Sequence, residues 1–156
     1  MIKITTRIIV EGKKPSQIYN WIFYLTPEQY HQWHPNAHIV CERPVNLKVE
    51  DTIWFEEVLN GFKISYKWKI IELKTDNSIL MKAKFFYPIY LQLSFLPFNK
   101  DTEVIHELRI GFSFKGLEKI FDWFVKRFIL TPKKVDAIKR HAIEEFKNLE
   151  NVLEDI

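Results

Sequence analysis

The fold is decided by the C-terminal stretch Thr131–Asp155, TPKKVDAIKRHAIEEFKNLENVLED, which predicts one long helix. At about 100° per residue, its apolar side chains fall on one stripe, which is the face that should be buried. The stripe consists of Val135, Ile138, Ala142, Leu149, Val152 and Leu153. Glu145 projects into the middle of this stripe, His141 lies one turn earlier at its edge, and Glu144 falls on the solvent side.

Glu145 needs a partner at that position, because burying an isolated carboxylate is costly. His141 and Glu145 are four residues apart, so their side chains point the same way on a helix and can share one ligand. Two interpretations remain open. The residues form either a His–Glu pair at a helix edge or half of a metal site whose other ligands lie elsewhere in the chain.

The composition predicts a single domain, residues 1–156, with room for a cavity. A chain of this length can bury a sizeable core. It contains 13 Phe, 6 Tyr and 5 Trp but only 4 Gly, which is more aromatic surface than such a core usually needs. The net charge is only +3 and the lysines are scattered, whereas a nucleic-acid-binding protein needs a concentrated basic stripe. No nucleic-acid partner is therefore expected.

The cysteine content and the N-terminal sequence predict a cytoplasmic protein. Cys41 is the one cysteine and cannot form an intrachain disulfide, which fits a reducing compartment. The N-terminus alternates apolar and polar residues and lacks the apolar core of a signal peptide. No apolar run approaches the roughly 20 residues that a membrane span requires, so a membrane partner is not expected.

The order of predicted elements is a strand, two short helices, about six antiparallel strands and the long helix. Strands are predicted at 2–10, 39–41, 52–59, 62–73, 79–86, 89–96 and 103–114, and shorter helices at 15–25, 26–33 and 116–130. An antiparallel sheet with one apolar face needs a cover, and the long helix supplies it. This order resembles the helix-grip fold of the START/Bet v 1-like (SRPBCC) superfamily. The resemblance implies an α+β fold in which a curved antiparallel sheet wraps around the C-terminal helix and leaves a cavity.

The hairpin around Asn60-Gly61 predicts which glutamate faces that cavity. Asn-Gly is the strongest two-residue turn signal, and with this turn Glu57 lies opposite Ile64. Directly opposed residues share a face, so Glu57 joins the apolar, inward-facing side chains and Glu56 faces outward. A one-residue bulge would exchange the two glutamates.

A histidine near the second helix completes the candidate site. His34 and His38 have the spacing of helical ligands, but Pro35 between them argues against a continuous helical turn. His38 follows a loop that should lie at the mouth of the cavity, and it is the favoured ligand, with His34 as the alternative. Two histidines with Glu57 and a helical carboxylate suit Zn²⁺, with Mn²⁺ or Fe²⁺ as alternatives.

Three motifs resemble one branch of this superfamily, the 2,4-diacetylphloroglucinol and phloretin hydrolases. They are Tyr30-His-Gln-Trp-His-Pro-Asn-Ala-His38, Phe55-Glu-Glu57 and His141-Ala-Ile-Glu-Glu145-Phe-Lys-Asn-Leu149. The resemblance implies a zinc enzyme that cleaves a carbon–carbon bond between an acyl group and a phenolic ring. It also implies a ligand set of His38, Glu57, His141 and Glu145. Tyr30 would then contact the phenolic substrate.

The remaining expectations concern chemistry and partners. His106 shares a strand face with Val104 and Leu108, and it is either a core histidine or an acid/base group that protonates the departing ring carbon or orients the water. A non-catalytic carrier of a hydrophobic or aromatic ligand is the alternative function. The helix at 116–130 is expected to form a lid or wall of the cavity, with contact to a second subunit, as in a homodimer, or to a membrane as alternatives.

Overall fold

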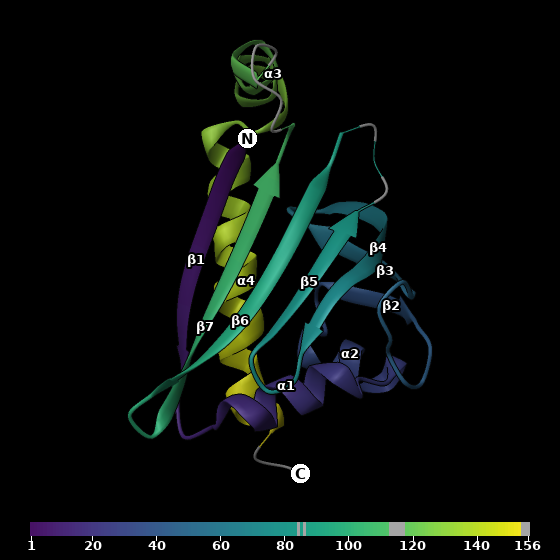
Figure 1. The fold of residues 1–156 in the computed structure, drawn as a ribbon, viewed down its shortest axis with the longest axis vertical. Coiled ribbons are helices and arrows are strands. Elements are labelled where there is room, and N and C mark those ends of the chain that lie inside the picture. The colour runs from purple at the N-terminus through teal and green to yellow at the C-terminus, as the bar shows by residue number, and fades with distance from the viewer. Residues whose placement is uncertain (84, 86, 113–117, 154–156) are drawn as a thin grey trace.

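The computed structural model describes residues 1–83, 85, 87–112 and 118–153 (Figure 1). The strands are β1 (Ile2–Val10), β2 (His38–Glu42), β3 (Thr52–Leu59), β4 (Phe62–Lys74), β5 (Ser78–Ala83), β6 (Ile89–Phe98) and β7 (Asp101–Ile110). The helices are α1 (Pro15–Phe23), α2 (Pro27–Trp33), α3 (Glu118–Phe124), the π-helix η1 (Val125–Ile129) and α4 (Pro132–Val152). In Figure 1, α4 runs along one face of the sheet, with α1 and α2 at the lower end and α3 above the upper end.

Among the described residues, the strands form one seven-stranded sheet in the order β1-β7-β6-β5-β4-β3-β2. Every neighbouring pair is antiparallel. Strands β1 and β2 stand at the ends of the order and form the two edges of the sheet. The curved antiparallel sheet and the C-terminal helix confirm the predicted α+β helix-grip fold. The predicted hairpin register is also confirmed, with Glu57 opposite Ile64. Asn60 and Gly61 both have positive φ, 51° and 80°, as a tight two-residue hairpin turn requires.

The buried face of α4 is broader than the predicted stripe. Ala142 and Leu149 are buried as expected, but the predicted stripe omits Phe146, which is only 1% exposed and extends the buried face beyond the edge of the stripe. The helix packs along β1, and the Phe146 ring also meets Trp33 of α2 edge-on, with ring centroids 5.5 Å apart. Contact with two elements explains the broader face. Glu144 is exposed, as predicted.

Several predicted boundaries differ from the structure. The turn expected at 97–101 is shorter, because β6 continues to Phe98 and the left-handed backbone of Asn99 (φ 57°) turns the chain into β7 at Asp101. The helix expected at 116–130 is α3 followed by a π-helical turn, and its first two residues lie outside the described part of the chain. The predicted ends of the strands at 79–86 and 103–114 and of the last helix fall partly on undescribed residues as well. No helix in the described ranges is long and apolar enough to cross a membrane.

Candidate metal centre

A short loop after α2 places His38 at the start of β2. Thr26 caps α2 by accepting a hydrogen bond from the Gln29 amide, and the helix ends at Trp33, before Pro35. The His34 carbonyl then accepts hydrogen bonds from the amides of both Ala37 (2.9 Å) and His38 (2.8 Å). This tight turn brings His38 opposite Glu57 of β3, where the two residues are register partners.

The His38 ring is held in one orientation and one tautomer. Its side chain is 0% exposed and stacks on the Tyr30 ring, with centroids 4.0 Å apart. Nδ1 donates a hydrogen bond to the Tyr30 carbonyl oxygen at 2.8 Å, whereas the buried Nε2 has no hydrogen-bond partner among the described residues. Burial lowers the pKa of His38 to about 3, so the imidazole is neutral. Its Nε2 therefore presents a lone pair, the form in which histidine binds a metal.

Glu57 faces inward and Glu56 faces outward, as the hairpin register predicts. Glu56 pairs with Lys63 on the outer face at 2.7 Å. Glu57 is buried and accepts a hydrogen bond from the Tyr30 hydroxyl. Its carboxylate lies 3.9 Å (Oε1) from His38 Nε2 and 3.6 Å (Oε2) from His141 Nε2. It therefore lies between the two imidazoles.

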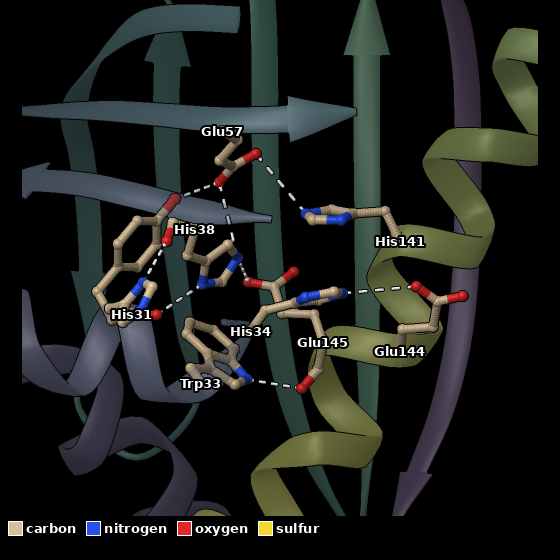
Figure 2. A network of polar contacts seen from close by, with 9 residues as sticks. His31, Trp33, His34, His38, Glu57, His141, Glu144 and Glu145 are labelled. Carbon is tan, nitrogen blue, oxygen red and sulfur yellow. Dashed lines mark hydrogen bonds and ion pairs between the residues drawn. The ribbon is translucent and has the colours of Figure 1, made fainter. Parts of the chain in front are cut away.

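Helix α4 contributes His141 and Glu145 from the opposite side (Figure 2). Glu145 Oε1 lies 3.7 Å from His38 Nε2. Burial, with a contribution from the Glu57 charge, raises the pKa of Glu145 well above its ordinary value. Burial also lowers the pKa of His141, and the nearby Glu57 charge partly opposes this shift. Trp33 Nε1 donates to the Glu145 backbone carbonyl at 2.6 Å and fixes this turn of α4 against α2.

These side chains form a donor set that fits a divalent metal ion. One ligand atom each from His38, His141 and Glu145 lies within 4.8 Å of the others, and Glu57 contacts both imidazoles. The clearest structural sign of an ion-binding site is the buried Nε2 of His38, which has no hydrogen-bond partner within the described part of the chain. A buried polar atom normally has such a partner. Two neutral imidazoles and two carboxylates are borderline-to-hard donors, which suit zinc. His34, the alternative ligand, is not one of the three residues whose ligand atoms lie within 4.8 Å of one another, although its ring is 5.2 Å from the His141 ring and 5.5 Å from the His38 ring.

The site forms one wall of a cavity of about 280 Å³ between the sheet and α4. Its described lining is mostly apolar, and the polar groups Tyr30, Glu57, His141 and Glu145 come together on one side. His106 of β7 also lines the cavity, as predicted from its strand face. Its Nδ1 is buried without a hydrogen-bond partner in the described ranges, and burial lowers the pKa of His106 to about 4. His106 is therefore a neutral imidazole on the cavity wall.

Tyr66 belongs to the site, although the sequence analysis does not single it out. It lines the cavity next to Glu57. Burial, with contributions from the Glu57 charge and a hydrogen bond to its carboxylate, raises the pKa of Tyr66 well above its ordinary value. The hairpin register could have identified Tyr66 from the sequence. It pairs Tyr66 with Phe55, which lies two residues from Glu57 and therefore on the same face.

Comparison with solved structures supports the fold. TTHA0849 from Thermus thermophilus is 12% identical, with 99% of this chain and 98% of that chain covered and a TM-score of 0.65. Ara h 8.0201 is 9% identical, with 99% of both chains covered and a TM-score of 0.69. The ginseng major latex-like protein 151 from Panax ginseng is 13% identical over 90% of this chain and 96% of that chain, with a TM-score of 0.60. At these identities the likeness concerns the fold, which is the START/Bet v 1-like helix grip.

No protein-family model matches the sequence, and the comparison with curated proteins finds no match.

Proposed function

We propose that this chain is a zinc-dependent hydrolase that acts on a small hydrophobic or aromatic carbonyl compound and cleaves the bond between an acyl group and an aromatic ring. The observation that carries the proposal is the convergence of Glu57, His141 and Glu145 on one wall of an apolar cavity, with the buried Nε2 of His38 directly behind them. The motifs that resemble those of the 2,4-diacetylphloroglucinol and phloretin hydrolases support the reaction type. The same donor set also suits Mn²⁺ or Fe²⁺.

The residues around the site have separate tasks in this reaction. A bound zinc ion supplies polarisation of a carbonyl group and lowers the pKa of a water molecule. Tyr30 and Tyr66 border the carboxylate of Glu57 and can orient substrate oxygens. His106 lines the same cavity as a neutral imidazole, where it can orient the attacking water or pass a proton to the departing ring carbon.

The bond changes balance without a further reactant. The water oxygen bonds to the acyl carbon, the carbon–carbon bond to the ring breaks, and the ring carbon keeps the electron pair and gains the proton. The products are a carboxylic acid and the deacylated aromatic compound. An electron-rich phenolic ring is the natural leaving group, because its hydroxyl groups make the ring carbon easy to protonate as the bond breaks, so no free carbanion has to form.

A second candidate function is the binding and transport of a hydrophobic ligand without reaction. The apolar lining of the 280 Å³ cavity favours it. The two functions differ in the use of the inward carboxylates, because a carrier has no need of Glu57 and Glu145 on an otherwise apolar surface.

Elemental analysis of the purified, untagged protein separates the two functions, with Glu145→Ala prepared in parallel. The hydrolase requires about one equivalent of zinc in the unchanged protein and its loss in the variant. Acylated phenols are then the substrates to screen for release of a carboxylic acid. Absence of metal from both samples, even after incubation with zinc, would leave the carrier function.

A further inference from the structure

The candidate metal centre lies below the surface, so a metal ion needs a path to reach it. His38 is fully buried, and the side chains of Glu57, His141 and Glu145 are largely buried. A divalent cation in water holds its hydration shell strongly, and an apolar path offers nothing in exchange for that water. The path should therefore be lined by groups that can replace water.

The cavity does not provide such a path. Most of its described lining side chains are apolar, so a hydrated cation would lose its water before it reached the ligands. The lining also includes Arg43, whose guanidinium is cationic and repels a metal ion. The cavity is suited to a hydrophobic molecule instead.

A polar route exists on the α4 side of the site, through His34 and Glu144. Glu144 is 62% exposed, and its Oε2 lies 3.5 Å from Nε2 of the buried His34. The His34 ring stacks on the His141 ring at a centroid distance of 5.2 Å and lies 5.5 Å from the His38 ring. Figure 2 shows the His34 ring directed toward the Glu144 carboxylate. The pair therefore links the solvent to two candidate ligands.

The state of the His34 ring is a second, independent observation. Neither of its ring nitrogens makes a hydrogen bond to a described residue, although both atoms are buried. A buried polar side chain without a hydrogen-bond partner calls for an explanation, and the binding of an ion is one. The ring is held in place by the tight turn at its own carbonyl and by stacking on His141, so it does not depend on those nitrogens for its position.

We propose that His34 and Glu144 form a transient cation site through which the metal ion passes from solvent to His38, His141 and Glu145. The inference rests on the proposed metal centre. The exposed Glu144 carboxylate attracts the cation, and the His34 imidazole replaces part of its water. The final ligands lie next to this ring, so the ion moves over a short distance without becoming fully desolvated.

The test is the rate of zinc uptake by metal-free protein, followed in a stopped-flow instrument with a chromogenic chelator as competitor. His34→Ala and Glu144→Gln should each slow uptake about tenfold or more, since a charged approach commonly changes association rates by about 10 to 1,000-fold. Release of zinc to excess chelator should slow by a similar factor, and the zinc stoichiometry at equilibrium should not change. Asp136→Asn is the matched control, because it removes one exposed carboxylate from the same helix, about two turns away.

Each alternative outcome overturns the route in a different way. Unchanged uptake rates in both variants would show that the ion takes another path. Loss of zinc at equilibrium from His34→Ala would make His34 a ligand of the final site. Failure of the unchanged protein to take up any zinc would refute the metal centre and the route together. Because Glu144 is exposed, Glu144→Gln keeps the test valid even if His34→Ala does not fold.

Discussion

Nδ1 of His38 donates a hydrogen bond to the carbonyl oxygen of Tyr30, eight residues earlier in the chain. A backbone carbonyl in the middle of α2 therefore fixes the tautomer of a side chain on β2. The Nε2 lone pair points toward Glu57 and Glu145. The donor geometry is thus prepared by the fold, which lowers the ordering cost of binding an ion.

Adjacent glutamates on opposite faces of β3 give a sharp test of the ligand set. Glu57→Gln removes an inward carboxylate, and we expect zinc affinity to fall at least about 10 to 100-fold. Glu56→Gln removes an outward carboxylate that pairs with Lys63, so zinc affinity should be unchanged. Competitive titration with a chelator measures both. Equal affinities in the two variants would exclude Glu57 as a ligand.

The Tyr30 hydroxyl should contribute measurably to stability. Tyr30→Phe keeps the ring stacked on His38 but removes the hydrogen bond to the buried Glu57. Because that bond reaches a carboxylate, metal-free Tyr30→Phe should be destabilised by about 1.5–3 kcal/mol. Urea denaturation gives the free energy of unfolding. Tyr24→Phe is the control. Tyr24 is exposed, so this substitution should change the free energy of unfolding by no more than about 0.5 kcal/mol.

The buried His106 predicts a pH dependence of stability. Burial lowers its pKa to about 4, so the unfolded chain binds a proton at its ordinary pKa, near 6.5, that the folded chain does not bind. The contribution of the neutral His106 to the free energy of unfolding is therefore complete above about pH 6.5. It is lost as the pH falls toward 4, by at most about 1.4 kcal/mol per pH unit. The lowered pKa of His38 makes the free energy of unfolding fall with decreasing pH in the same way. The comparison is thus between the unchanged protein and His106→Leu in urea at several pH values, and parallel pH profiles would contradict the prediction.

Metal binding should release a proton from Glu145. Burial raises the pKa of this carboxyl group well above its ordinary value, so in the metal-free protein it keeps its proton to a higher pH than an exposed glutamate does. A metal ligand must be deprotonated. We expect release of about one proton per zinc ion, measured by calorimetric titration in buffers of different ionisation enthalpy. Binding without buffer-dependent heat would mean that Glu145 is already ionised or does not bind the ion.

The sequence contains enough information to place Glu57, but not the residues around it. The Asn60-Gly61 turn sets the register, and the register sets the face, so local chemistry is sufficient. The predicted stripe on the last helix leaves out Phe146. Its burial depends on Trp33, far earlier in the chain, which the helical period does not represent.

The loop at His34 shows the same limit. Pro35 correctly predicts the end of α2, but the His34 carbonyl that closes the turn onto His38 becomes visible only in three dimensions. The His34–Glu144 pair joins a loop to a helix that lies far away in the sequence, so no spacing within either segment predicts it.

The candidate site joins residues that belong to elements at opposite edges of the sheet. Helix α4 packs along β1, one edge, whereas His38 lies on β2, the other edge. An ion held by His38 together with His141 and Glu145 would therefore connect β2 at one edge to the helix that packs on β1 at the other. Such an ion would be a reversible cross-link between α4 and the far strand, added to the Trp33–Glu145 hydrogen bond that already holds this turn of α4 against α2.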